Sequence, residues 1–231
     1  MGSTRLPGKV LATILGEPML ALLIRRLQPS HFVHRFVVAT TLRPEDAQIE
    51  RLAGDLGIER FRGSEVDCLD RYYQAASVFN AAVVVRLTAD NPLVDAAFVD
   101  WVLEEFSPAR PQYDYVDSGH SRTFPLGLAV EAFTFEALAT AWQGDCSPQW
   151  REHVTPFIYR HPERFRIKHL ASPDDYSHLR WTVDTPEDLA FMRRIYEHFG
   201  RSQFSWREVL AVLDEHPDWA AINSQVEQKR L

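Results

Sequence analysis

The 231-residue chain is long enough for one large α/β domain, and its 45% hydrophobic and 25% charged residues are typical of a globular protein. Its formal net charge of −7 argues against broad nonspecific nucleic-acid binding, because such binding needs a basic face that releases counterions. The two cysteines, Cys68 and Cys146, are far apart in the sequence, which argues against a disulfide framework and against a cysteine-ligated zinc site.

No apolar run approaches the ~20 residues that a membrane-spanning helix requires, and the start of the chain lacks the apolar core of a signal peptide. We therefore expect a cytoplasmic protein that binds neither a membrane nor nucleic acid. An anionic substrate is compatible with the acidic composition if local Arg and Lys residues, or a metal ion, neutralise it.

Strands and helices are expected to alternate along the chain. Short apolar runs predict strands at Phe36–Thr40, Ala82–Leu87 and Tyr113–Val116, and Arg180–Val183 also has the pattern of a short strand. Helical patterns cover Pro44–Leu56, Glu65–Phe79, Ala96–Phe106, Thr134–Trp142, Pro186–Phe199 and Trp206–Glu215. This alternation indicates a mainly parallel sheet with helices on both faces. We expect a single domain over residues 1–231, in which residues 200–231 form a peripheral helical segment.

The chain opens with a basic, glycine-containing loop. It consists of Gly2, Ser3, Thr4, Arg5, Leu6, Pro7, Gly8 and Lys9. Backbone N–H groups and two cations are what a triphosphate needs, although a frayed basic N-terminus explains the pattern equally well. The loop is not a P-loop, because its glycines are too far apart and Val10 stands where that motif has the Ser or Thr that binds magnesium.

In α/β sheets a loop of this kind follows the carboxyl end of a strand, yet no strand precedes it here. We therefore expect that the first strand of the sheet is missing from this chain, and that it would be central, with a partner on each side. Each buried backbone group left unpaired by its loss costs about 1–3 kcal/mol. Restoring upstream residues is expected to raise both the melting temperature and the activity.

Two aspartates follow predicted strands. Asp90 comes shortly after Ala82–Leu87 and before a turn that contains Pro92, and Asp184 comes directly after Arg180–Val183 and before a helix. Each has a simple structural alternative, as a turn residue or a helix cap. Ligands of α/β sheets bind at the carboxyl ends of strands, and Mg²⁺ prefers carboxylate oxygens. The two aspartates together therefore predict a Mg²⁺ site.

Two weaker clusters are candidates for substrate pockets. Arg62–Asp67, which includes Ser64, either lines a base or ribose pocket or caps the following helix. Arg151–Thr155, which includes Glu152 and His153, could touch an acceptor, although a histidine is more simply a core or surface residue. The chain has no H-E-x-x-H or G-x-S-x-G motif, which disfavours a zinc hydrolase and an α/β-hydrolase. No G-x-G-x-x-G follows a strand, which disfavours a dehydrogenase.

Five ordered motifs resemble those of the SpsF-type (spore-coat polysaccharide biosynthesis) cytidylyltransferases, and the opening motif also resembles the 3-deoxy-manno-octulosonate cytidylyltransferases. They are Gly2–Leu11 with Gly16–Leu20, Arg62–Tyr72, Arg86–Leu93, Glu152–Pro156 and Val183–Leu189. The resemblance covers nearly the whole chain and extends more distantly to the acylneuraminate cytidylyltransferases. It implies a Rossmann-like, three-layer nucleotide-diphospho-sugar transferase fold.

The same resemblance implies that CMP is transferred from CTP to a sugar acid or related anionic acceptor with release of pyrophosphate, for surface polysaccharide or glycoconjugate biosynthesis. It assigns the triphosphate to Arg5 and Lys9 with Gly2, Ser3 and Thr4, Mg²⁺ to Asp90 and Asp184, and the side of the nucleotide base to Ser64. It assigns the acceptor to Arg122, Glu131, Glu152, His153 and Arg180. A homodimer is a further family-level expectation.

Two features depart from the family pattern. These families usually begin with an apolar strand that ends in Gln-Ala-Arg or Pro-Ala-Arg, whereas Met1 stands directly before the loop here, and Ala129 replaces an aspartate that many SpsF-like chains have. Two other functions stay open on the sequence: a metal-dependent glycosyltransferase and a catalytically degenerate nucleotide-binding subunit. Pyrophosphate release from CTP distinguishes a cytidylyltransferase from both.

Overall fold

The computed structural model describes residues 3–106 and 112–228. The strands are β1 (Thr13–Ile14), β2 (Glu17–Pro18), β3 (Val37–Thr41), β4 (Glu59–Gly63), β5 (Val83–Arg86), β6 (Tyr115–Asp117), β7 (Glu131–Thr134) and β8 (Ile167–His169). The α-helices are α1 (Met19–Leu27), α2 (Ala47–Asp55), α3 (Cys68–Val78), α4 (Ala96–Phe106), α5 (Phe135–Gly144), α6 (Pro148–His153), α7 (Pro156–Tyr159), α8 (Pro186–Phe199), α9 (Trp206–Glu215) and α10 (Pro217–Ala220). Two 3₁₀ turns, η1 (Lys9–Leu11) and η2 (Pro44–Asp46), complete the elements.

The largest sheet has the strand order β5-β7-β6-β8, and its strands mostly run one way. β7 is antiparallel to both of its neighbours, and β8 is parallel to β6, so β5, β6 and β8 share one direction. The separate pair β3-β4 is also parallel. The predicted mixed, mainly parallel α/β architecture is therefore confirmed.

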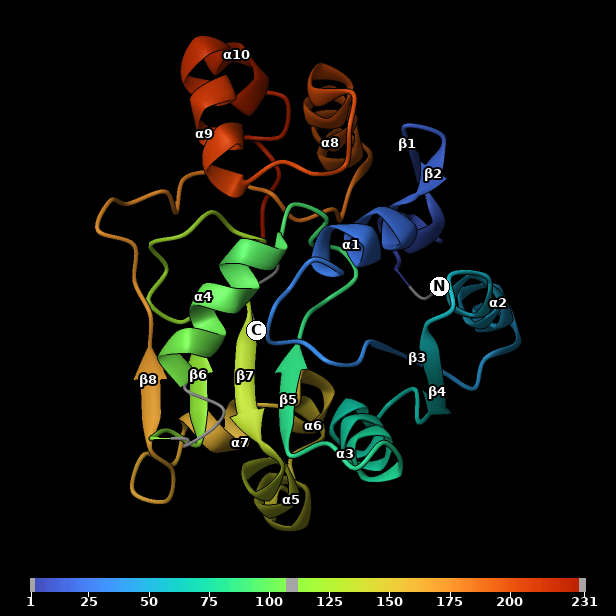
Figure 1. The fold of residues 1–231 in the computed structure, drawn as a ribbon, viewed down its shortest axis with the longest axis vertical. Helices are drawn as coiled ribbons and strands as arrows, with labels where there is room; N and C mark the ends of the chain where they lie inside the picture. The colour runs from blue at the N-terminus through green and yellow to red at the C-terminus, as the bar shows by residue number, and fades with distance from the viewer. Residues whose placement is uncertain (1–2, 107–111, 229–231) are drawn as a thin grey trace.

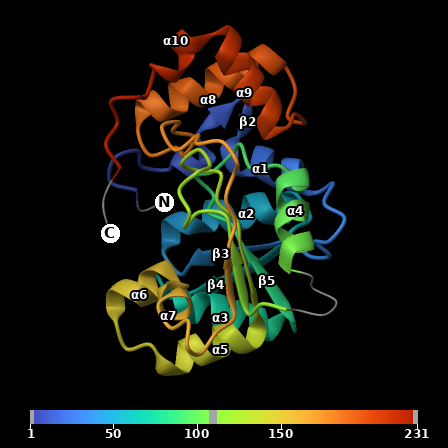
Figure 2. The same ribbon diagram turned by 90° about the vertical axis from the view of Figure 1, so that its left-hand side faces the viewer.

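Helices cover both faces of this sheet (Figures 1 and 2). α4 lies on one face, where its apolar residues join a buried cluster with Val116 of β6 and Ala132 of β7. α3, α5 and α7 lie on the other face, in a cluster with Tyr115 of β6 and Phe133 of β7. Neighbouring residues of a strand thus point to opposite faces, as the pleat of a strand requires.

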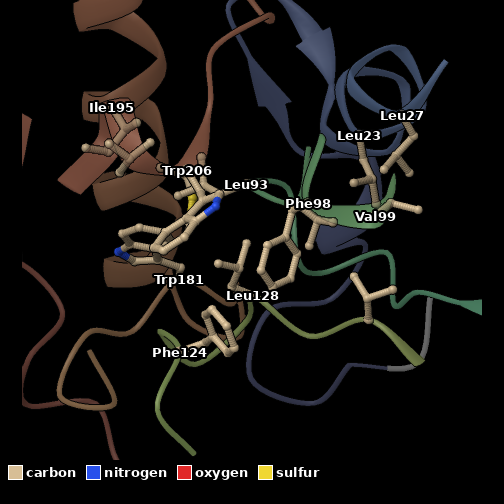
Figure 3. Close-up of a cluster of buried hydrophobic side chains, with 14 of the residues drawn as sticks. Leu23, Leu27, Leu93, Phe98, Val99, Phe124, Leu128, Trp181, Ile195 and Trp206 are labelled. Atoms are coloured by element: carbon tan, nitrogen blue, oxygen red, sulfur yellow. The ribbon is translucent and has the colours of Figure 1, made fainter. Parts of the chain in front are cut away.

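The main core joins α4 to the C-terminal helices. Figure 3 shows Phe98 of α4 near Phe124 and Trp206, and the ring centroids of these two pairs are 5.1 and 5.9 Å apart in edge-to-face contacts. Such aromatic pairs stabilise a core beyond their buried area. The segment predicted to be peripheral contributes Trp206 of α9 and Trp219 of α10 to this cluster.

The pair β3-β4 packs on a smaller cluster of its own, formed mainly by Leu20 and Ile24 of α1 and by Ile49 and Ala53 of α2. β3 pairs with β4 and β5 pairs with β7, and no ladder joins β3 to β5 within residues 3–106 and 112–228. The two sheets are therefore separate. That a further strand fits between them stays a prediction.

The three apolar runs predicted as strands and the six predicted helices are all present, with shifts at some ends. The strands β1, β2, β4, β7 and β8 and the helices α1, α6 and α7 were not predicted. The strand predicted at Arg180–Val183 was wrong. This segment forms a single parallel bridge between Leu126 and Arg180, because its backbone N–H groups bind loops instead. Trp181 N donates to Leu126 O, and Val183 N donates to Asp90 O. Among the described helices, none has both the length and the apolar character needed to cross a bilayer.

Candidate active site

Lys9 lies between two aspartates that are far apart in the sequence. Its Nζ atom is 2.7 Å from Oδ2 of Asp90 and 2.8 Å from Oδ1 of Asp184. Because both oxygens touch one nitrogen, they cannot be further apart than the sum of these two distances. The three side chains are mostly buried, with 13% of Lys9, 26% of Asp90 and 16% of Asp184 exposed. The two carboxylates therefore converge on one point.

Backbone contacts bring the two aspartates together. Val183 N donates to the carbonyl oxygen of Asp90 over 2.8 Å, which fixes the segment before Asp184 against the loop after β5. The segment also passes so close to Gly127 that a Cβ atom there would lie 2.6 Å from the backbone nitrogen of Thr182. Gly127 has φ +106, a conformation that side chains disfavour. Glycine is thus required where this segment crosses the loop.

Two guanidinium groups contact Oδ2 of Asp184, the carboxylate oxygen that Lys9 does not contact. Arg5 Nη2 and Arg180 Nη2 lie 2.8 and 2.9 Å from Asp184 Oδ2. Burial alone would raise the pKa of Asp184, but Lys9, Arg180 and Arg5 together lower the pKa below its ordinary value of 3.8. Asp184 is therefore a carboxylate at neutral pH and can ligate a cation.

Asp188 is the fully buried partner that orients Arg180. Its oxygens accept hydrogen bonds from Arg180 Nε at 2.8 Å and Nη2 at 2.9 Å, and from the backbone N–H groups of Asp184 at 2.9 Å and Thr185 at 3.0 Å. The same carboxylate completes the capping box at the start of α8. The sequence pattern shows the cap, but it does not show that a buried arginine shares it. We refer to Arg5, Lys9, Asp90, Arg180, Asp184 and Asp188 as the Lys9 cluster.

The segment after α10 also reaches the Lys9 cluster. Asn223, only 2% exposed, donates to the carbonyl oxygen of Arg180 at 3.0 Å and to Asp188 Oδ1 at 2.9 Å. Gln228 Oε1 accepts from Arg180 Nη1 at 2.6 Å, and the carbonyl oxygen of Glu227 accepts from Arg5 Nη1 at 3.3 Å. Sequence reasoning missed these residues because no motif marks them.

The opening loop supplies the two cations, and its other members have different surroundings. Ser3 Oγ accepts a hydrogen bond from Leu6 N at 3.2 Å, which closes the loop on itself. Thr4 is exposed, and the predicted site residue Gly2 lies outside the described residues. The contacts of this loop with the aspartates thus come from Arg5 and Lys9.

Ser64, predicted to lie toward the nucleotide base, follows β4. Its Oγ accepts from the backbone N–H of Asp67 at 3.0 Å, and its carbonyl oxygen accepts from the guanidinium of Arg71. No hydrogen bond or ion pair among the described residues joins Ser64 to the Lys9 cluster. These contacts support the alternative that it caps the turn before α3, and a role toward the base stays a prediction.

The residues assigned to the acceptor do not form one group, because Arg180 belongs to the Lys9 cluster. Glu131, the first residue of β7, accepts hydrogen bonds from the hydroxyls of Tyr115 at 2.7 Å and Thr155 at 2.5 Å. It also forms an ion pair with Arg86 of β5. This pairing was not predicted, because it depends on the register of β7.

The other three predicted acceptor residues are less buried. Arg122 lies exposed in the loop between β6 and β7 with φ 52, Glu152 is exposed on α6, and His153 is half-buried at the end of α6. No side-chain hydrogen bond or ion pair ties any of them to Glu131 or to the Lys9 cluster in the part of the chain that the structure describes. Their role in acceptor binding stays a prediction.

The pair Asp90 and Asp184 has the donor chemistry of a divalent-cation site. Carboxylate oxygens are the protein ligands that Mg²⁺ takes, and its remaining positions usually hold water or phosphate oxygens. Both carboxylates already share one positive charge, the ammonium of Lys9. Within the described residues there is no group of three or more His, Cys, Asp and Glu side chains suited to a metal. A metal ion at this point would therefore take its other ligands from water or substrate.

The chain matches the family model for cytidylyltransferases over residues 1–208. The spore coat polysaccharide biosynthesis protein SpsF of Bacillus subtilis is 32% identical over 228 residues, which cover 95% of this chain and 93% of that protein. A 3-deoxy-manno-octulosonate cytidylyltransferase of Chlorobium chlorochromatii is 36% identical over 113 residues, 48% of this chain and 44% of that enzyme.

Solved structures have the same fold. A cytidylyltransferase from Leptospira borgpetersenii matches with a TM-score of 0.92 and 31% identity, over 100% of this chain and 95% of that one. The CMP:2-keto-3-deoxy-manno-octonic acid synthetase complexed with CTP matches with a TM-score of 0.63 at 18% identity, over 85% of this chain and 95% of that one. The fold is therefore that of the α/β nucleotidyltransferases. Within this class, the chain belongs to the cytidylyltransferase family, which confirms the resemblance to SpsF-type proteins.

Proposed function

We propose that the protein transfers CMP from CTP to a sugar acid or related anionic acceptor, with release of pyrophosphate, in the synthesis of a surface polysaccharide or glycoconjugate. The observation that carries this proposal is the convergence of Asp90 and Asp184 on Lys9 in a chain of the cytidylyltransferase family. The name of SpsF supports the polysaccharide role, and the names of the two octulosonate enzymes support a sugar acid.

Arg5 and Lys9 bind the triphosphate of CTP in this proposal. Both are cations on the opening loop, and both already contact a carboxylate of the cluster. Phosphate oxygens make charge-assisted hydrogen bonds with such groups. Arg180 is held by the buried carboxylate of Asp188, so its main task is to orient Asp184.

Asp90 and Asp184 hold Mg²⁺, for which their carboxylates are suitable ligands. When bound, Mg²⁺ neutralises the charge of the phosphate oxygens and makes the α-phosphorus more electrophilic. Asp184 is available as an ionised ligand, because its cationic neighbours outweigh the effect of burial and its pKa lies below the ordinary value.

The transfer itself is a single displacement. A hydroxyl or anionic oxygen of the acceptor attacks the α-phosphorus of CTP, and the bond from this phosphorus to the oxygen bridging the α and β phosphates breaks. CMP is thereby joined to the acceptor, pyrophosphate leaves with the bonding electron pair, and a hydroxyl proton, if present, passes to solvent. Positioning and charge neutralisation provide the rate, so no nucleophilic side chain is required.

A pyrophosphate-release assay tests the proposal. CTP, UTP, ATP and GTP are each incubated with a panel of sugar acids, with MgCl₂ and with EDTA. We expect release with CTP and one or more sugar acids, and none with EDTA. Calorimetry shows in parallel whether CTP binds.

The other outcomes are equally informative. CTP binding without turnover of any acceptor would support a degenerate nucleotide-binding subunit, and transfer of a sugar from a nucleotide sugar without pyrophosphate release would support a glycosyltransferase. Turnover that survives EDTA would contradict the magnesium requirement.

A further inference from the structure

Four side chains lie next to one another across the carboxyl end of the largest sheet. In the strand register Arg86 pairs with Glu131. Glu131 also pairs with Asp117, which in turn pairs with His169 on its other side. Glu131 accepts the hydroxyl of Tyr115, which lies on the face covered by α3, α5 and α7, and neighbouring register partners share a face. We refer to Arg86, Glu131, Asp117 and His169 as the cross-sheet row.

The end of this row is a histidine held by a buried carboxylate. His169 Nδ1 is 2.5 Å from Asp117 Oδ2, and only 3% of the Asp117 side chain is exposed. The other oxygen, Oδ1, accepts the backbone N–H groups of Gly119 at 2.9 Å and His120 at 2.6 Å. Asp117 thus acts as an acceptor, and the ring hydrogen of His169 belongs on Nδ1. In the neutral ring this leaves Nε2 as an acceptor.

Nε2 of His169 is free to take a ligand. The His169 side chain is 31% exposed, and no hydrogen bond among the described residues uses this nitrogen. The ring of His120 stacks on it with centroids 4.1 Å apart and an interplanar angle of 16°, and the ring of Tyr159 lies 5.4 Å from that of His120. The acceptor atom Nε2 of His169 therefore lies on a ring that stacks on His120, and Tyr159 extends this aromatic surface.

With neutral imidazoles, the charges of the row disfavour an anion as its ligand. Arg86 is neutralised by its ion pair with Glu131, so the carboxylate of Asp117 leaves the row with a net negative charge when the imidazoles are neutral. Arg122, two residues after His120, is exposed and forms no ion pair with the row among the described residues. A neutral group that donates hydrogen bonds is the better match, because it meets an acceptor nitrogen without charge repulsion.

We propose that His169, oriented by Asp117 and flanked by His120, binds a hydroxyl group of a sugar-like acceptor at a point away from the transferred phosphate. This inference rests on the proposed function, which requires a sugar-like acceptor, and on the rule that ligands of α/β sheets bind at the carboxyl ends of the strands. The acidic group of the acceptor then lies elsewhere, toward the cations of the Lys9 cluster.

The distance between the two clusters suits one substrate molecule. Asp90 follows the carboxyl end of β5, whereas Asp117 and His169 end β6 and β8, which lie two and three strand positions away. With neighbouring strands ~4.8 Å apart, the lateral separation is roughly 10–15 Å. An acceptor that spans this distance would be held at its hydroxyl-bearing end by the histidine.

Imidazole resonances of the ¹⁵N-labelled full chain test this inference without turnover. D-mannose serves as the neutral hydroxyl-bearing probe and inorganic phosphate as the anionic probe. We expect a saturable shift of the His169 Nε2 signal with D-mannose and none with phosphate. His161 is an internal control, because its Nδ1 atom is also hydrogen-bonded, here to the carbonyl oxygen of Phe157 at 2.6 Å, but the residue lies outside the row. Its signal is expected to stay unchanged.

Two substitutions of one residue sharpen the test. His169→Asn keeps a donor near Asp117 but removes the group at the position of Nε2, whereas His169→Gln keeps a polar group at that position. The affinity for D-mannose is followed through the His120 signal. It is expected to fall about 3- to 10-fold in His169→Asn, the range for the loss of one hydrogen bond. A smaller decrease is expected in His169→Gln. His169 lies in an exposed position on an edge strand, so both variants are expected to fold.

A shift caused by phosphate and not by D-mannose would overturn the inference, as would no shift with either probe or equal D-mannose binding in all three proteins. With a sugar acid that the wild type converts, His169→Asn is expected to raise the KM for that acceptor while kcat and the KM for CTP stay unchanged. If the wild type converts no acceptor at all, the proposed function fails, but the D-mannose titration still decides whether the row binds hydroxyls.

Discussion

The Lys9 cluster and the cross-sheet row both lie at the carboxyl end of the largest sheet, yet they are assembled in different ways. The Lys9 cluster joins residues from the opening loop, from the loop after β5 and from the start of α8, and charge holds it together. The row joins residues from four neighbouring strands, and backbone register holds it together. The first has three cations beside three carboxylates, whereas the second ends in an imidazole with a free nitrogen.

This difference separates two tasks that a transferase must perform. A dense arrangement of fixed charges suits the triphosphate and a metal ion, which are the same for every acceptor. Side chains of the cross-sheet row can be substituted one at a time without changing the groups that are proposed to bind the phosphates. The following changes test that separation, from the largest expected effect to the smallest.

Asp184→Asn and Asp90→Asn are each expected to lower turnover by about 10²–10³-fold. Removal of one charged or hydrogen-bonding group that stabilises a transition state typically has an effect of this size. The size and shape of each side chain stay the same, so the fold is expected to be preserved. Pyrophosphate release gives the rate, and circular dichroism checks the fold. A near-normal rate in either variant would contradict the assignment of the two aspartates to the metal ion.

Asp188→Asn is expected to lower the free energy of unfolding by about 1–3 kcal/mol, because it removes the fully buried one of the two carboxylates that pair with Arg180 and leaves only Asp184. Urea unfolding measures the change. Glu187→Gln is the matched control, since Glu187 is the exposed neighbour on the same helix turn, and little change is expected there. Equal stability of the two variants would show that Asp188 is not the partner that holds Arg180.

Gly127→Ala is expected to lower the free energy of unfolding by about 1–3 kcal/mol, because the new Cβ atom meets the backbone of Trp181 and Thr182 at 2.6 Å. The shift of this segment should also lower turnover, since Asp184 follows it. Gly119→Ala is the control: its Cβ atom would meet Ala129 at an ordinary 3.5 Å. If the two variants have the same melting temperature and rate, the close crossing at Gly127 is not a constraint.

The smallest effect is expected from Asp114, which lies just before β6, the strand that ends in Asp117. Hydrogen bonds from Arg166 lower the pKa of Asp114 below its ordinary value of 3.8. The contribution of Asp114 to stability is therefore complete above pH 3.8 and is lost as the pH falls through the lowered pKa. Urea unfolding at pH 6 and pH 3 should show a slightly smaller acid-induced loss for Asp114→Asn than for the wild type. A larger loss in the variant would reverse the sign and contradict this account.

The sequence predicted the Lys9 cluster better than it predicted the row. Asp90 and Asp184 each stand at the start of a turn or helix after an apolar segment, and Lys9 lies in a loop whose composition suits phosphates, so local patterns and family resemblance found all three. The contacts of Arg180 with the buried Asp188 were not predicted, because no sequence pattern marks them, and the assignment of Arg180 to the acceptor stays a prediction.

The row escaped sequence analysis because two of its four strands were not predicted. β7 (Glu-Ala-Phe-Thr) and β8 (Ile-Lys-His) lack the continuous run of β-branched residues that marked β5, and both are too short to show an alternation of apolar and polar residues. Glu131 was expected near the acceptor, but its partners Arg86 and Tyr115 depend on a pairing register that a single sequence does not reveal. Asn223 was missed for a similar reason, since it reaches Asp188 from the far end of the chain.

The buried carboxylate of Asp188 limits how this enzyme scaffold can be redesigned. It completes the cap at the start of α8, binds Arg180 and accepts a hydrogen bond from Asn223, so a change there would disturb three parts of the molecule at once. A library for new acceptors should leave Asp188 untouched and vary the edge-strand position His169, where substitutions reach solvent and the backbone pairing of β6 with β8 is kept.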